Sequence, residues 1–207
     1  MIDVVAIDGP VGSGKSTVAR RVGSALGLDV LDTGAMYRAV TLLAIERGLD
    51  LGDGETIARA AEEAVLELGD PPGSVRLDGR DVSAEIRGPA VSAGVSEVSS
   101  HPAVRALLRA RQREWAEQHG GGVVEGRDIG TVVFTDAPLK VFLTADEGER
   151  ALRRSRDEEA AARPADLESV RDAVDRRDAL DNQTTPLTPA PDAVLIDTTG
   201  RDIDDVV

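Results

Sequence analysis

Short apolar runs of strand length alternate along this chain with longer segments whose apolar residues recur at helical spacing. Ile2 to Ile7 is a β-branched run that ends in Asp8-Gly9, and from Ser16 to Leu26 the apolar residues fall three and four positions apart. Gly27 follows as a C-cap, and LDVLD, residues 28–32, has the length of a short strand. Strands that alternate with helices predict a parallel sheet with both faces covered.

The middle of the chain predicts helices on both sides of a different kind of segment. Helical spacing runs over Gly34 to Arg47 and Glu55 to Leu68, and again over Val91 to Val98 and Pro102 to His119. Between them, Gly69 to Gly88 has paired prolines and then short runs around Asp78-Gly79, a dipeptide expected in a tight hairpin turn. This predicts a small antiparallel insert.

The second half returns to alternating elements. VVEGRDIGTVVF (residues 123–134) and LKVFLTAD (139–146) each have an apolar core of strand length. Asp146 to about Leu180 is helical in pattern, highly charged and broken at Arg163-Pro164, and Ala193 to Gly200 supplies a last strand before a closing helix. We therefore expect an α/β fold with a parallel sheet core flanked by helices, the antiparallel insert and a charged helical excursion.

Composition narrows the class of protein. With 207 residues, 41% of them hydrophobic and only 2% aromatic, the chain can build a sizeable core that must be aliphatic. The absence of cysteine excludes disulfides and a cysteine nucleophile and fits a reducing compartment. No signal-like segment or run of 18 apolar residues occurs, so we expect a cytoplasmic protein with no membrane partner. A net charge of -14 argues against a nucleic-acid partner bound by a broad basic face.

GPVGSGKST, residues 9–17, fits the pattern G-x-x-x-x-G-K-[ST] between a predicted strand and a predicted helix. Such a loop points backbone N–H groups inward beside the positive end of the helix dipole. The lysine can reach the β and γ phosphates of a nucleoside triphosphate, and the serine hydroxyl can bind Mg²⁺. The residues of this phosphate loop are Gly9, Pro10, Val11, Gly12, Ser13, Gly14, Lys15, Ser16 and Thr17.

The alternative for this stretch is a glycine-rich turn that only caps a helix, and the strand and helix around it favour the phosphate site. Its glycine spacing does not match the dinucleotide fingerprint G-x-G-x-x-G, which argues against a redox role. No N-K-x-D motif for reading guanine is present. A kinase or an ATPase is therefore favoured over a GTP-dependent switch.

Two further stretches place polar side chains where the predicted strands end. In LDTGAMYRA, Thr33 follows a strand, and Tyr37 and Arg38 lie one turn into the next helix. They could hold a second anionic ligand, or be an N-cap, a core-edge aromatic and a solvated arginine, and the stretch alone leaves these alternatives equal. In EGRDIGT, residues 125–131, Arg127 could fork onto phosphate oxygens or form a structural pair that fixes the loop.

Arg150, Arg153 and Arg154 recur at helical spacing near the start of the charged helical segment. They could converge on a transferring phosphoryl group, or form ordinary i,i+4 pairs from Glu149 to Arg153 and from Arg154 to Glu158. Their position between two late strands favours a lid that closes to exclude water.

Several of these stretches together resemble one family, the bacterial cytidylate kinases of the P-loop nucleoside monophosphate kinase group. The resemblance runs from Ile2 to about Asp197 and is carried by GPVGSGKST, LDTGAMYRA, DGRDVSAEIR, VSEVSSHPAVRALLRARQR and VVEGRDIGTVVF. It implies the P-loop NTPase fold and the transfer of the γ-phosphoryl group of ATP, with Mg²⁺, to CMP or dCMP. The charged helix becomes a lid, and a monomer is expected.

The resemblance also implies roles for individual residues. The phosphate loop would bind ATP, with Ser16 on the metal, and the residues of catalysis would be Lys15, Arg127, Arg150, Arg153 and Arg154. The CMP pocket would be lined by Thr33, Tyr37, Arg38, Ser96, Arg105, Glu125, Arg127 and Asp128. Ser96, Arg105 and Asp128 are the candidates to face the base, and Arg38 and Arg127 to face phosphate or sugar.

One kinase unit over residues 1–207 is expected to divide into three regions. The core would comprise 1–33, 94–145 and 181–207, the monophosphate-binding region 34–93 with its insert at about 69–93, and the lid about 146–180. The chain departs from the family pattern at Glu125, where some relatives carry aspartate, and in LDNQTTPL, residues 180–187, which lacks an arginine usual there. A kinase for another small acceptor such as UMP, or a P-loop regulatory ATPase, remains an alternative.

Overall fold

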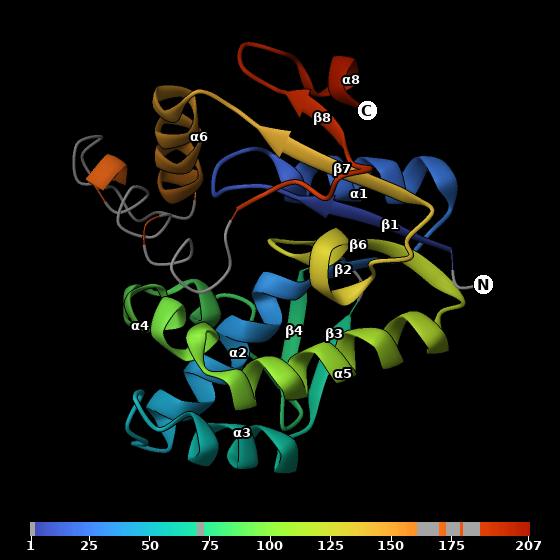
Figure 1. Ribbon diagram of the computed structural model, residues 1–207. Coiled ribbons are helices and arrows are strands. Elements are labelled where there is room, and N and C mark those ends of the chain that lie inside the picture. The colour runs from blue at the N-terminus through green and yellow to red at the C-terminus, as the bar shows by residue number, and fades with distance from the viewer. Residues whose placement is uncertain (1–2, 70–72, 161–169, 173–178, 180–186) are drawn as a thin grey trace. The chain divides into compact units, whose positions relative to one another are not determined.

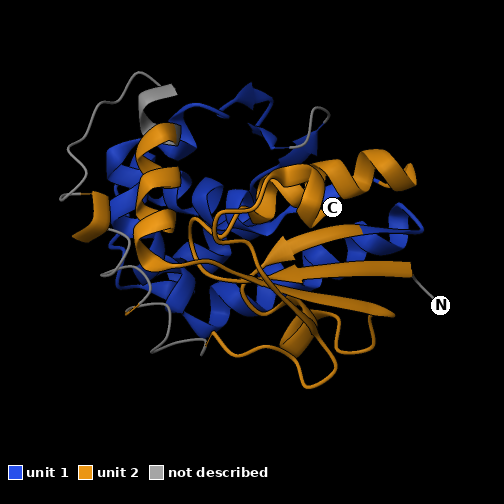
Figure 2. Cartoon of the chain, turned by 90° about the horizontal axis from the view of Figure 1, so that it is seen from above, with its two compact units in different colours: residues 1–2, 29–122 blue, residues 3–28, 123–207 orange. Residues whose placement is uncertain are grey.

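The computed structural model describes residues 3–69, 73–160, 170–172, 179 and 187–207. The chain divides into two compact units, shown in separate colours in Figure 2. Unit 1 comprises residues 1–2 and 29–122, and unit 2 comprises residues 3–28 and 123–207. The phosphate loop and the charged helix belong to unit 2, and the antiparallel insert belongs to unit 1.

Unit 2 is built on a sheet. The strands β6 (Gly121–Gly126), β1 (Asp3–Asp8), β7 (Leu139–Thr144) and β8 (Val194–Asp197) are hydrogen-bonded neighbours in that order. β1 pairs with β7, and β7 with β8, in parallel, as Figure 1 shows. These pairings confirm the predicted parallel sheet core. Val4 to Ile7 of β1 are buried, as expected for a parallel strand that is covered on both faces.

Helices of unit 2 follow three of these strands. α1 (Lys15–Leu26) follows β1 and ends at Gly27, whose φ of 66° confirms the predicted left-handed C-cap. α6 (Glu147–Ala160) follows β7, and α8 (Ile203–Val206) follows β8. The predicted charged helix is therefore confirmed over α6, whereas its continuation to Leu180 and the break at Arg163-Pro164 lie outside the described residues. Among the described residues no helix has the length and apolar character needed to cross a membrane.

The strand expected within residues 123–134 occupies only their start. β6 ends at Gly126, so EGRDIGT lies at the end of a strand as the sequence predicts, and Ile129–Val133 form a single π-helical turn, η2. Its backbone bonds span five residues: the N–H of Val133 donates to the carbonyl of Asp128 (3.2 Å) and that of Phe134 to Ile129 (2.7 Å). The first two N–H groups of this turn bind the side chain of Asp8, the last residue of β1. A contact over this sequence separation leaves no trace in the local sequence pattern.

Unit 1 is mostly helical. α2 (Thr33–Glu46) follows the short strand β2 (Val30–Asp32), and α3 is Gly54–Glu63. After the insert come a 3₁₀ turn, η1 (Glu85–Arg87), then α4 (Pro89–Ser100) and α5 (Pro102–Gln118). α2 packs against α4, and α3 against α5. The buried side chains between them are aliphatic, as the composition predicts: Met36, Val40, Leu43, Ile57, Val91, Val98 and Leu108.

The antiparallel insert is confirmed, with one correction at its start. β3 (Leu66–Gly69), β4 (Ser74–Leu77) and β5 (Arg80–Asp81) form a three-stranded sheet, and the β4–β5 turn is Asp78-Gly79, with φ of 50° and 79°. The helix predicted to reach Leu68 instead ends at Glu63. Leu66 and Leu68 pair with Leu77 and Val75 of β4, so the cross-strand partner decides the conformation of a segment whose spacing suits either structure.

Candidate active site

The phosphate loop lies between β1 and α1, at the carboxyl end of the sheet in unit 2. Its glycines have positive φ angles, 151° at Gly9 and 78° at Gly12. A Cβ on Gly9 would collide with the carbonyl oxygen of Leu143, and one on Gly12 would lie 2.6 Å from the carbonyl oxygen of Arg150. Both positions therefore require glycine, because neighbouring backbone occupies the space of a side chain.

The side chains at the start of α1 are arranged over this loop. Lys15 Nζ donates to the carbonyl oxygen of Pro10 (2.7 Å), so the ammonium group lies across the loop. The Ser13 hydroxyl donates to the same carbonyl (3.0 Å) and is fully buried, which fixes the turn from within. The first turn of a helix offers backbone N–H groups that have no partner within the helix. The loop thus has the donor groups that an anion site needs, with the Lys15 ammonium group beside them.

Glu125 brings a carboxylate to the phosphate loop. It is the penultimate residue of β6, it is 4% exposed, and its Oε2 accepts a hydrogen bond of 3.0 Å from the Ser16 hydroxyl. The sequence predicts Ser16 on a metal and Glu125 in the acceptor pocket. The structure brings the two together, which gives a pair of oxygen ligands suited to a divalent cation at the position of the β and γ phosphates.

The segment after β6 carries Arg127, which is half-buried, and Asp128, which is buried. The carboxylate of Asp8, the last residue of β1, lies behind this segment. Its Oδ1 accepts from the N–H of Ile129 and its Oδ2 from the N–H of Gly130, both at 2.8 Å. Burial raises the pKa of the Asp8 carboxyl, the two backbone N–H groups oppose that rise, and Asp128 adds to it.

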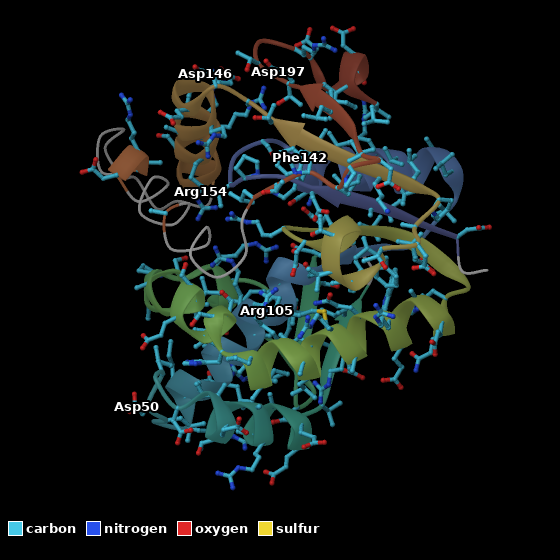
Figure 3. All side chains as sticks on the ribbon, in the orientation of Figure 1. Asp50, Arg105, Phe142, Asp146, Arg154 and Asp197 are labelled. Atoms are coloured by element: carbon cyan, nitrogen blue, oxygen red, sulfur yellow. The ribbon has the colours of Figure 1, made fainter. Side chains whose placement is uncertain are left out.

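The arginines of α6 do not all face one point. The Arg150 guanidinium is buried, and its Nη1 donates to the carbonyl of Val11 in the phosphate loop (3.2 Å). Arg153 donates from Nη1 to Thr198 Oγ1 (2.8 Å) and from Nη2 to Thr198 O (2.7 Å). Its Nε donates to Glu149 (2.9 Å), so the i,i+4 pair of the alternative interpretation is present as well. Arg154 projects from the same helix, where Figure 3 labels it, and the side chain of Glu158 lies outside the described residues.

Thr198 is the centre of this arrangement and was missed by sequence analysis. Its hydroxyl has the carbonyl oxygens of Thr144 (3.0 Å) and Ser13 (3.2 Å) within hydrogen-bonding distance and can donate its one proton to either, which ties the segment after β8 to β7 and to the phosphate loop. The hydroxyl of the next residue, Thr199, accepts a hydrogen bond from the backbone N–H of Asp146 and donates one to the carboxylate of Asp197. Figure 3 labels both aspartates. A polar DTTG sequence directly after a strand was the only available signal.

A cavity of about 460 Å³ opens beside these contacts within unit 2. The phosphate loop and start of α1, α6, and the segment after β8 all contribute to its wall. Its lining includes Gly14, Thr17, Glu149, Arg153, Thr198 and Ile203. The cavity therefore lies next to the N-terminus of α1, where the phosphate site is found.

The predicted acceptor residues of unit 1 are fixed by their own neighbours. Thr33 is buried in the first turn of α2, but the N-cap is Asp32, whose Oδ1 accepts from the N–H of Ala35 (3.0 Å), so the alternative of a Thr33 cap is wrong. Arg38 Nη1 donates to the carbonyl of Ile86 (3.1 Å) and to Ser92 Oγ (3.0 Å). This half-buried arginine is thereby held against η1 and α4.

Ser96 in the last half of α4 and Arg105 in the first turn of α5 are linked through Ser99. Arg105 Nη1 donates to the carbonyl of Ser99 (3.5 Å), and the Ser99 hydroxyl donates to the carbonyl of Ser96 (3.1 Å). Both predicted base-facing residues are half-buried, as is Tyr37 on α2. Unit 1 thus brings two candidates for base recognition to one helix junction, and the guanidinium in Figure 3 projects from the start of α5.

A strand, a glycine loop and a helix that begins with lysine and serine, set at the carboxyl end of a parallel sheet, define a P-loop nucleotide-binding protein with the parts of a phosphotransferase. The family model described as cytidylate kinase matches residues 5–207. The chain therefore belongs to the cytidylate kinase family. Kinases of this family use ATP as the phosphate donor.

Two curated relatives agree with this assignment. The cytidylate kinase of Mycolicibacterium paratuberculosis is 52% identical over 94% of this chain and 87% of that protein. That of Rhodococcus opacus is 50% identical over 99% of this chain and 91% of that protein. Among solved structures, the shikimate kinase of Acinetobacter baumannii matches with a TM-score of 0.44 at 15% identity, over 100% of this chain and 89% of that one.

Proposed function

We propose that this protein is a CMP/dCMP kinase, which transfers the γ-phosphoryl group of ATP to CMP or dCMP. An oxygen of the acceptor phosphate forms the new bond to the γ phosphorus while the bond to the β–γ bridging oxygen breaks, which yields ADP and CDP or dCDP. The match to the cytidylate kinase family over residues 5–207 is the observation that carries this proposal. The geometry of the phosphate loop supports it.

ATP would be bound entirely by unit 2. The loop amides and Lys15 suit the triphosphate, because they offer N–H donors and one ammonium group around the start of α1. The adjoining cavity suits the adenosine part, since it opens directly from Gly14 and Thr17 and is walled by Arg153, Thr198 and Ile203. The cavity provides both an arginine face and apolar contacts for a base.

Mg²⁺ would be held by the Ser16 hydroxyl and the Glu125 carboxylate. These two oxygen-bearing groups fit the ion, because Mg²⁺ prefers oxygen ligands and usually takes only one or two from the protein beside phosphates and water. When bound, the ion supplies charge neutralisation at the β and γ phosphate oxygens. For Glu125 this role differs from the contact with the acceptor sugar that the family resemblance implies.

For the acceptor, we assign phosphate or sugar contacts to Arg38 and Arg127, and base contacts to Ser96, Arg105 and Asp128. Guanidinium groups suit phosphate oxygens because they donate two parallel hydrogen bonds, and a carboxylate with a serine can match the amino and keto groups of cytosine. Thr33 and Tyr37 would line the same pocket. The departure in residues 180–187 lies outside the described residues, apart from Leu187.

The chemistry would need positioning and charge neutralisation and no strong base, because the acceptor phosphate is already an anion. Lys15 would stabilise the charge that develops between the β and γ phosphates. Arg150, buried against the carbonyl of Val11, and Arg153 and Arg154 on the same helix would act as a lid that excludes water.

We further assign the protein to pyrimidine nucleotide metabolism in the cytoplasm, as a monomer without nucleic-acid or membrane partners. The lack of cysteine and the net charge of -14 support a reducing compartment and the absence of a nucleic-acid partner. Light scattering of the purified protein tests the monomer.

A coupled ADP-release assay with CMP, dCMP, UMP, AMP and no acceptor tests the proposal, with CDP identified by phosphorus NMR. We expect turnover with CMP and dCMP well above that with UMP or AMP, and almost none without acceptor. Preferential use of UMP would indicate a kinase for another acceptor. ADP release that needs no acceptor would indicate a regulatory ATPase.

A further inference from the structure

Asp8 is a buried carboxylate that the proposed reaction does not use directly. It is the last residue of β1 and is 6% exposed, and each of its two oxygens accepts a backbone N–H at 2.8 Å. Because both oxygens are engaged and covered, the group is poorly placed to bind a metal or a substrate. Charged groups are seldom buried unless their contacts compensate for lost hydration, so its role must lie in what it holds.

The two N–H groups that Asp8 accepts belong to Ile129 and Gly130, which follow Arg127 and Asp128 directly. The residue after Asp8 in the chain is Gly9, the first of the phosphate loop. The Asp8 side chain therefore joins the start of the phosphate loop to the segment that carries two residues proposed to bind CMP. These contacts span 121 and 122 positions of sequence.

Lys140 holds the same segment from its other end. In the register of β1 and β7, Lys140 lies opposite Ala6, so its side chain is on the face of the sheet that Asp8 also occupies. Its Nζ donates to the carbonyl of Thr135 (2.6 Å), just after η2, and to Asp192. A Cβ on Gly130 would lie 3.1 Å from Lys140 Cδ and 3.4 Å from Asp8 Oδ2. η2 is thus bracketed by one carboxylate and one ammonium group.

We propose that Asp8 is a positioning residue, which holds Arg127 and Asp128 in place for the acceptor through the backbone of Ile129 and Gly130. The inference rests on the proposed CMP/dCMP kinase function. Without the carboxylate, two buried N–H groups lose their acceptors, and the turn that starts at Ile129 is free to shift. Phosphate-loop contacts formed by backbone amides do not depend on that turn.

The test compares Asp8→Asn and Gly130→Ala with the wild-type protein. The first change puts an N–H₂ group where an acceptor is needed, and the methyl group added by the second presses η2 away from Lys140 and Asp8. We expect the KM for CMP to rise about 10- to 100-fold in Asp8→Asn and to rise measurably, by less, in Gly130→Ala, while the Kd for ATP stays within about 2-fold in both. In Asp8→Asn, the amides of Ile129 and Gly130 should also exchange faster with solvent by NMR.

Ile57→Val is the matched control, because Ile57 is fully buried in α3 and its truncation lowers stability without touching β1 or η2. Its KM for CMP should stay near the wild-type value. Gly130→Ala keeps the proposal open to refutation if Asp8→Asn does not fold, because it leaves the carboxylate in place. An unchanged KM for CMP in Gly130→Ala, or an equal loss of ATP and CMP binding in either variant, would overturn the inference.

Failure of the proposed function has a different signature. If the wild-type protein phosphorylates neither CMP nor dCMP, the kinase proposal fails before any variant is made. Amide exchange at Ile129 and Gly130 still reports whether Asp8 holds the turn, because it needs no substrate. Unchanged exchange in Asp8→Asn would overturn the positioning role by itself.

Discussion

The Ser16 hydroxyl, in the first turn of α1, donates a hydrogen bond of 3.0 Å to Oε2 of Glu125, 109 residues later in the chain. This bond places a buried carboxylate at the entrance of the phosphate loop. A hydroxyl and a carboxylate at that point are the protein ligands with which P-loop enzymes bind the Mg²⁺ of their nucleotide. The contact therefore supports the proposed role of Glu125 as a ligand of the metal.

Glu125→Gln keeps the shape of the side chain and removes its charge. We expect the Mg²⁺ concentration for half-maximal activity to rise about 10-fold, because a carboxylate binds the ion far better than an amide does. Titration of activity with Mg²⁺ at saturating ATP and CMP measures it. Glu147→Gln, an exposed residue in the first turn of α6, is the control. A rise confined to the KM for CMP would instead support the contact with the acceptor sugar.

Lys15→Ala should lower kcat by about 10²-fold or more, equivalent to about 3 kcal/mol of transition-state stabilisation. The reason is that Lys15 is the cation of the phosphate loop and would stabilise the negative charge that develops between the β and γ phosphates during transfer. Lys15→Arg, which keeps the charge with a different geometry, should recover only part of the rate. Steady-state kinetics at saturating substrates decide the matter, and normal turnover of Lys15→Ala would contradict the assignment.

Arg127→Ala should impair the use of CMP and leave ATP binding unchanged. Loss of a charge-assisted hydrogen bond costs about 1.5–3 kcal/mol, so the KM for CMP should rise about 10- to 100-fold. Arg113→Ala, which removes an exposed arginine of α5, controls for the change in net charge. If the CMP kinetics of Arg127→Ala match the wild type, the residue only fixes its loop, which was the structural alternative.

Arg153 and Thr198 should act as a unit on ATP. Arg153→Met removes both hydrogen bonds that connect α6 to Thr198 at the wall of the cavity, 2.8 Å to Oγ1 and 2.7 Å to the backbone carbonyl, and Thr198→Val removes the one to Oγ1. Each should raise the KM for ATP about 10-fold, and the double variant should do little more than either one. A double-mutant cycle on kcat/KM for ATP measures this coupling. Strictly additive effects would show that the two residues act independently.

Asp192→Asn should lower stability in a pH-dependent way. The hydrogen bond from Lys140 lowers the pKa of the Asp192 carboxyl, so the folded state favours the ionised form. The stabilisation is present above the ordinary pKa of an aspartate and is lost as the pH falls through the lowered folded value. The difference in Tm between wild type and variant should therefore be seen at neutral pH and shrink progressively as the pH falls below about 4.

Asp136→Asn serves as the control for Asp192→Asn, because it removes the same charge from an exposed position near by. Both variants keep Asp8, whose raised pKa has the opposite effect: its contribution to stability is lost as the pH rises through the folded value. That contribution cancels when the two variants are compared. A Tm difference that persists unchanged at pH 3 would contradict the role of the ion pair.

Local patterns were sufficient for most of the elements. The phosphate loop, α2, α4, α5, α6 and the Asp78-Gly79 hairpin could all be predicted, because spacing, caps and turn residues act within a few positions of each other. The errors occurred where a distant partner decided the conformation. Residues 66–69, predicted to be helical, became a strand through β4. The helical turn at residues 129–133, whose first N–H groups bind Asp8, likewise could not be predicted from the sequence.

The amino-acid sequence by itself determined the strand, glycine loop and helix of the phosphate loop and the likeness to the cytidylate kinase family, since those motifs are contiguous and depend on local backbone geometry. The tertiary structure alone decided that Glu125 meets Ser16, that Thr198 receives Arg153, and that Asp8 holds the turn after Arg127 and Asp128. Each of these contacts joins residues from strands or helices far apart in the chain. Hydrogen bonds depend on position in space, which sequence spacing encodes only within single elements.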